Sequence, residues 1–143
     1  MNFVNSVLII IFGSLVCGCG GVSDAPKLAT VEGIVIWKGL PLAEAGVAFT
    51  PESGPIATGT TDVTGRFTLM TQGREGAPIG SHRVTIQAYE APPAGKPPVD
   101  ANGEPTYTPV SKIPSKYSSL DQSGLEAQVT SNGKENTFQF DLN

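Results

Sequence analysis

Short segments in which apolar and polar residues alternate, separated by turns that contain Gly or Pro, make up most of the chain after its N-terminal region. In the last segment Phe138, Phe140 and Leu142 alternate with polar residues, which indicates a strand with one buried face. The pattern predicts seven strands, over residues 30–37, 46–50, 56–61, 66–71, 82–89, 125–130 and 136–142. Short strands with turns about every ten residues are typical of a β-sandwich.

Two of the predicted turns contain residue types that favour hairpins. Asp62-Val63-Thr64-Gly65 begins with Asp and ends with Gly, which suits a type I turn followed by a residue with positive φ. Ser131-Asn132-Gly133-Lys134 contains Asn-Gly, the strongest short signal for a hairpin turn. We therefore expect the strands on either side of each turn to pair with each other.

The one long irregular segment runs from Glu90 to Gly124 and contains the pairs Pro92-Pro93 and Pro97-Pro98. Loops longer than about 15 residues in a compact domain are usually functional or disordered. We expect residues 91–108 to form a mobile excursion. The Pro-Pro pairs either stiffen this loop or form a polyproline ligand for a partner domain.

The N-terminal region has a different pattern, an apolar run over residues 7–16 that ends in Cys17-Gly18-Cys19. The run is shorter than the roughly 20 apolar residues that a transmembrane helix needs. Small residues and a cysteine follow it, as in an export signal, although no Lys or Arg precedes it. Residues 16–19 resemble a bacterial lipobox, in which a small residue precedes the lipidated cysteine. We expect Cys19 to be lipidated, with Cys17 as the alternative.

This interpretation divides the chain into a signal peptide (1–18), a lipidated cysteine with its tether (19–28) and one β-domain (29–143) with a Pro-rich loop at 91–112. The protein would be lipid-anchored on the extracytoplasmic side of the cell envelope. Gly20 rather than Asp follows Cys19, which favours the outer membrane in bacteria that sort lipoproteins by this position.

Composition narrows the function classes further. The net charge is −4 and the charges are spread along the chain, which argues against binding to nucleic acid or to anionic lipid by charge. Both cysteines lie in the N-terminal region, so the mature domain has no thiol nucleophile, cysteine metal site or disulfide framework.

We predict no catalytic residue, no metal site and no cofactor. His82 is the only histidine, and no orienting carboxylate or nucleophile can be assigned to it, so a structural role is expected. Asp62 stands alone, whereas a calcium site needs several carboxylates grouped in one loop. Trp37, Tyr107 and Tyr117 are candidates for a binding surface on which a sugar would stack.

The order of several turn-plus-strand motifs resembles the carboxypeptidase regulatory-like domain. The motifs are Val31-x-Gly33-x-Val35, Gly39-x-Pro41-Leu42, Ala45-x-Val47-x-Phe49, Thr61-Asp62-x-x-Gly65-x-Phe67-x-Leu69 and Gly80-x-His82-x-Val84-x-Ile86. The C-terminal part, from Ile113-Pro-x-Lys-Tyr117 to Asn136-x-Phe138-x-Phe140-x-Leu142, is similar to small bacterial lipoproteins that carry this domain. The resemblance implies a seven-stranded Greek-key β-sandwich of the transthyretin (prealbumin-like) type.

The same resemblance implies an accessory role in stability, adhesion or binding. We expect a non-catalytic, lipid-anchored envelope protein with a structural or protein-interaction function and an envelope protein or glycan as partner. Two alternatives are a carbohydrate-binding lipoprotein and a small hydrolase of the transthyretin-like fold. The hydrolase known for this fold uses several histidines and a distinct C-terminus, both of which this chain lacks.

Overall fold

The computed structural model describes residues 25–95, 97 and 99–143. The predicted signal peptide, Cys17, Cys19 and most of the tether lie outside the described residues. The described chain is all-β, with two 3-10 helices and no α-helix. Its strands are β1 (Leu28–Ala29), β2 (Glu32–Trp37), β3 (Leu40–Pro41), β4 (Gly46–Pro51), β5 (Ala57–Thr60), β6 (Arg66–Thr68), β7 (Met70–Thr71), β8 (Arg74–Glu75), β9 (Ala77–Pro78), β10 (Gly80–Gln87), β11 (Leu125–Val129) and β12 (Thr137–Leu142), and its 3-10 helices are η1 (Ser115–Ser118) and η2 (Gly133–Glu135).

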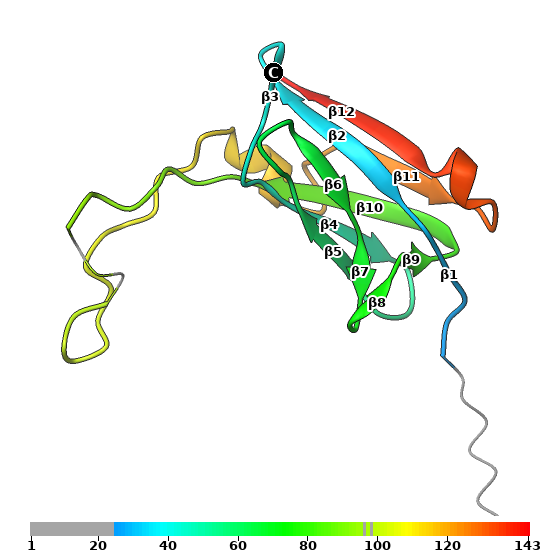
Figure 1. Cartoon of the computed structure of the whole chain (residues 1–143), viewed down its shortest axis with the longest axis horizontal. Coiled ribbons are helices and arrows are strands. Elements are labelled where there is room, and N and C mark those ends of the chain that lie inside the picture. The colour runs from blue at the N-terminus through cyan, green and yellow to red at the C-terminus, as the bar shows by residue number, and fades with distance from the viewer. Residues whose placement is uncertain (1–24, 96, 98) are drawn as a thin grey trace, which may run out of the picture.

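Most strands belong to two sheets that pack face to face (Figure 1). The large sheet has the order β11-β10-β4-β5-β7-β8, and all of its pairs are antiparallel. The small sheet has the order β12-β2-β3, with β6 also paired to β2. A separate two-stranded ladder joins β1 to β9. This layered arrangement is consistent with the predicted β-sandwich.

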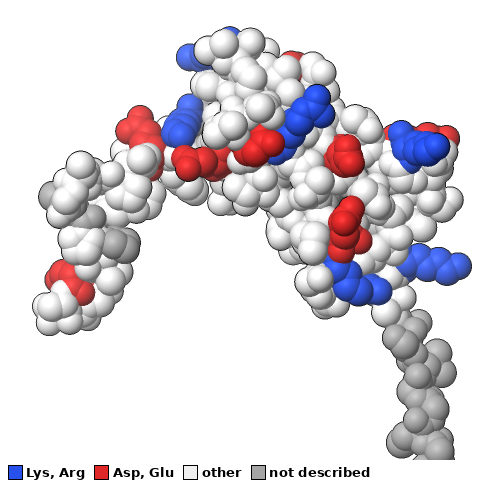
Figure 2. Space-filling model, in the orientation of Figure 1, with Lys and Arg blue, Asp and Glu red and all other residues white. Residues whose placement is uncertain are grey.

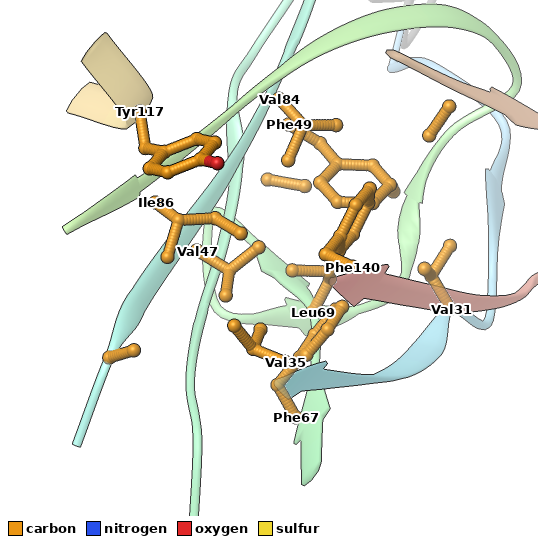
Figure 3. Packing of buried hydrophobic residues seen from close by; sticks show 14 of the residues in the cluster. Val31, Val35, Val47, Phe49, Phe67, Leu69, Val84, Ile86, Tyr117 and Phe140 are labelled. Atoms are coloured by element: carbon orange, nitrogen blue, oxygen red, sulfur yellow. The ribbon is translucent and has the colours of Figure 1, made fainter. Parts of the chain in front are cut away.

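The core lies between the two sheets and contains the apolar residues that the alternation predicts. Phe49 on β4 is at its centre (Figure 3), with its ring centroid 6.0 Å from that of Phe140 on β12 and 6.3 Å from that of Phe67 on β6. Val84 and Ile86 on β10 are buried in the same cluster. Burial of apolar surface is the main source of stability in such a fold, at about 25 cal/mol per Å².

The first predicted turn is confirmed, but the strands that flank it belong to different sheets. Gly65 has φ +75°, and the carboxylate of Asp62 accepts hydrogen bonds from Thr64 and Arg66. After the turn, β6 pairs with β2 and β7 pairs with β5. The prediction of one strand over 66–71 is therefore wrong, because the chain passes from the small to the large sheet at Leu69, whose side chain is completely buried.

The second predicted hairpin is wrong. β11 pairs antiparallel with β10 in the large sheet, whereas β12 pairs parallel with β2 in the small sheet. The Asn-Gly segment forms η2 instead of a hairpin turn, and Asn132 accepts a hydrogen bond from Lys134 N at its start. The physical reason is that β12 buries Phe140 and Leu142 against the core from a place beside β2, which a hairpin with β11 would not allow.

The long loop forms a narrow projection with two arms, here called the finger (residues 89–111) (Figure 1). Its two arms meet at the base, where Glu90 N donates to Val110 O at 2.8 Å. They meet again near the tip, where Val99 pairs with Pro105. No described residue of the finger is buried. After the finger the chain returns to the body, where Ile113 joins the core.

Candidate functional site

His82 is a core residue. Its side chain on β10 is only 3% exposed, and its ring centroid lies 5.8 Å from that of Phe49. Nδ1 lies 3.0 Å from Gly80 O, while Nε2 is buried without a hydrogen-bond partner. Burial lowers the pKa of His82 below its ordinary value, which favours the neutral ring. These surroundings fit the structural role expected for His82.

Asp62 is part of a turn, as expected. Its Oδ1 accepts hydrogen bonds from Thr64 Oγ1 at 2.6 Å, Thr64 N at 2.8 Å and Arg66 N at 3.1 Å. These bonds, led by that of the Thr64 hydroxyl, lower the pKa of Asp62. Within the part of the chain that the structure describes, no group of three or more His, Cys, Asp or Glu is placed to hold a metal ion.

The tip of the finger repeats this turn. Asp100 Oδ1 accepts from Asn102 N at 2.8 Å and from Glu104 N at 2.9 Å, as Asp62 accepts from Thr64 and Arg66. Gly103 has φ +84° and donates to Asp100 O, as Gly65 donates to Asp62 O. Backbone hydrogen bonds from Glu104 and then Asn102 lower the pKa of Asp100. The finger therefore ends in a turn of defined geometry.

The three aromatic candidates lie in different settings. Tyr117 on η1 is buried beside Ile86 (Figure 3), and its hydroxyl is hydrogen-bonded to the backbone of Asn143. It therefore has no ring face open to a sugar. Trp37, at the end of β2, is half-buried against the core and carries Lys38 Nζ 4.9 Å from its ring centroid. Tyr107 is half-buried in the finger, which projects from the body. The structure thus does not bring these rings together as a flat platform.

A groove of about 490 Å³ crosses the outer face of the large sheet, over β4, β5 and β10. No charged side chain lines it. Its lining residues are Gly46, Val47, Ala48, Thr58, Gly59, Thr60, Met70, Thr85 and Gln87. Its polar side chains are threonine hydroxyls and one amide, and no acid or base lies among them to activate a hydroxyl as a nucleophile.

The two ends of the sandwich differ in what they carry. The first described residues leave from one end, here called the tether end, where β1 pairs with β9 (Figure 1). β10 starts at this end and leads to the finger at the other, here called the finger end. The eight residues of β10 span about 26 Å at 3.3 Å per residue, which separates the two ends.

The finger end also exposes two aliphatic side chains. Leu40, the first residue of β3, is 70% exposed, and Val63, in the Asp62 turn, is 87% exposed. The Asp62 turn lies against β3, because a Cβ placed on Gly65 would lie 3.1 Å from Pro41 Cβ. Leu40, Val63 and the finger form the candidate interaction surface.

The sequence places Val63 in the Asp62 turn, but neither Val63 nor Leu40 is among the candidate residues that it predicts. For Val63 a signal was present, because an apolar residue inside a turn motif has no sheet face on which to pack. Isolated exposed apolar residues are common on protein surfaces. Leu40 and Val63 differ from isolated residues in lying on segments that touch, at the end of the domain from which the finger projects.

Comparisons of this chain with protein-family models, curated proteins and solved structures found no match. In the part of the chain that the structure describes, no helix has the length and hydropathy needed to span a membrane. The function is therefore inferred from the surfaces and contacts of the domain itself.

Proposed function

We propose that this chain is a non-catalytic, lipid-anchored protein of the cell envelope, whose β-sandwich acts as a structural or protein-interaction module. One observation carries the proposal: the N-terminal segment and the finger leave from opposite ends of the domain (Figure 1). An anchor at Cys19 would hold the tether end near the membrane. Leu40 and Val63, at the opposite end of the sandwich, would then lie away from it, where a protein or glycan partner could reach them.

The length of the tether supports this orientation. Five residues lie between Cys19 and Ala25, the first described residue, so the six residue steps between the two reach about 20 Å when fully extended. The finger end lies about 26 Å beyond the start of β10, by the rise per residue of a strand. The tether is too short to let the domain turn over and place its finger end on the same membrane.

We further propose that the domain is a seven-stranded Greek-key sandwich of the transthyretin-like, carboxypeptidase regulatory-like type. The strands of three or more residues are β2, β4, β5, β6, β10, β11 and β12. The connections from β2 through β3 to β4, from β5 to β6 and from β11 to β12 each pass from one sheet to the other. Such crossings beside the β4–β5 hairpin and the antiparallel pair β10–β11 support a Greek-key topology.

Membrane fractionation combined with mass spectrometry of the mature N-terminus tests the anchor. The wild-type protein should fractionate with membranes and begin with a cysteine that carries lipid. Cys19→Ser should become soluble or remain unprocessed, whereas the matched control Cys17→Ser should behave like the wild type. A soluble wild-type protein would overturn the proposal. Lipid that persists in Cys19→Ser and disappears in Cys17→Ser would move the anchor to Cys17.

A further inference from the structure

The place where the described chain begins is fixed to the body of the domain. Ile79 N donates a hydrogen bond to Lys27 O at 3.1 Å, and Arg74 Nη2 donates to Pro26 O at 3.4 Å. Next to these contacts Leu28 pairs with Pro78 in the β1–β9 ladder. The described chain therefore begins at a fixed point of the domain, beside Ile79.

Exposed aliphatic side chains lie at this same end. Ile79 is 43% exposed and borders a groove of about 230 Å³ that Pro51, Glu52 and Ser53 also line. The loop that continues from Ser53 leads to Ile56, which is 50% exposed. Two branched aliphatic residues are therefore exposed at the tether end, Ile79 beside Lys27 and Ile56 in the loop between β4 and β5.

The charges favour this end over the finger as the part that meets a membrane. The cations Lys27 and Arg74 are exposed at the tether end together with the acids Glu52 and Glu75, so that opposite charges balance. The finger contains Glu90, Asp100 and Glu104 against the single cation Lys96 in its sequence, and Figure 2 shows acidic side chains on its outer part. An anionic lipid surface would repel the finger but not the tether end.

We infer that the tether end rests on the membrane surface, with Ile79 and Ile56 inserted among the lipid headgroups. The inference rests on the proposed anchor at Cys19. The tether brings the bilayer within about 20 Å of Ala25, and the exposed isoleucines gain by leaving water for the acyl boundary. This contact would orient the domain with its tether end toward the lipid.

Fluorescent labels on single cysteines test this contact in the lipidated, full-length protein. The mature chain has no cysteine besides the acylated one, so an introduced thiol is the only one that reacts. An environment-sensitive dye would be attached to Ile79→Cys, to Ile56→Cys and, as the matched control at the finger end, to Val63→Cys. Each protein would be reconstituted in phosphatidylethanolamine–phosphatidylglycerol vesicles that contain a fraction of brominated lipid.

Brominated lipid should quench the dye at position 79 and at position 56 about twofold or more, because it would lie in the headgroup layer, and should leave the dye at position 63 unchanged. Two positions are labelled so that the test still works if one variant fails to fold. The urea midpoint of each variant would reveal such a failure. Equal quenching at both ends, or none at 79 and 56 in protein that stays on the vesicles, overturns this inference and leaves the anchor intact. Protein that carries no lipid and does not bind vesicles overturns the anchor and the inference together.

Discussion

Replacement of Asn136 by alanine should destabilise the domain by about 3 kcal/mol. Asn136 is completely buried, and its side chain connects two distant backbone segments where the chain crosses from β11 to β12. Nδ2 donates to Thr130 O at 2.9 Å and to Thr30 O at 3.1 Å, and Oδ1 accepts from Thr130 N at 2.8 Å. Alanine would leave these three backbone groups without a partner. Each such loss costs about 1–3 kcal/mol, and the lower value applies here because Thr30 and Thr130 are partly accessible to water.

Urea denaturation followed by fluorescence or circular dichroism measures this loss. With a slope of about 1.5–2 kcal/mol per M, typical of a small domain, the midpoint of Asn136→Ala should fall by about 1.5–2 M. Asn132→Ala is the matched control, because Asn132 is an exposed asparagine of the same segment that caps only η2. Its cost should stay near or below 1 kcal/mol. Equal shifts in the two variants would refute the view that the Asn136 side chain holds the crossover together.

Three further variants test other parts of the structure. Gly65→Ala should lower the free energy of unfolding by about 2 kcal/mol or more, because φ is +75° and the new Cβ would lie 2.7 Å from Val35 O. The matched control Gly39→Ala, with φ +81° and open space around the new Cβ, should lower it by about 1 kcal/mol. Equal urea midpoints for the two variants would contradict this. The lowered pKa of His82 means that the unfolded chain binds a proton more readily than the folded one, so stability should be complete above the unfolded pKa of about 6.5 and fall as the pH drops below it. His82→Leu should remove this loss between pH 7.5 and 5.5, and an unchanged loss would assign it to other groups. Replacement of residues 91–108 by a short Gly-containing link should leave the thermal midpoint nearly unchanged, because no described residue of the finger is buried, and a large drop would show that the finger supports the core.

The sequence was sufficient for the strands and their buried faces because these follow from local alternation. Val47 and Phe49 on β4, and Phe140 and Leu142 on β12, are buried as the period of two predicts. The positive φ of Gly65 also follows from local turn chemistry. In each case the neighbours of the residue along the chain determine the outcome.

The partner of each strand could not be predicted in this way. Asn132-Gly133 carries the residue types of a hairpin turn, yet β12 pairs with β2, about a hundred residues earlier in the chain. The long-range contacts of Asn136 with Thr30 and of Phe140 with the core override the preference of the dipeptide. The same holds for Leu69, where a change of sheet interrupts a sequence that alternates without a break.

The candidate site was predicted less well than the fold, for a related reason. An aromatic residue in an irregular segment has no period from which its exposure can be inferred. Tyr117 is buried because η1 packs on β10 and because its hydroxyl is hydrogen-bonded to Asn143, the residue that follows β12. Val63 lies in the predicted Asp62 turn and Leu40 begins β3, and only the contact between these two segments makes them one surface.

In the two Asp-Gly turns, local hydrogen bonds determine the conformation, and the place of the turn in the fold determines what it can contact. Asp62–Arg66 and Asp100–Glu104 have the same pattern of hydrogen bonds, although one turn joins two sheets and the other ends the finger. Because these bonds lie within five consecutive residues, the finger tip holds its shape without help from the core. A partner that contacted the tip would meet a preorganised surface, so that little conformational entropy would be lost on binding. No described residue in the arms of the finger is therefore buried, whereas its tip is as well defined as a turn of the sandwich itself. An element that presents a surface to a partner requires this combination.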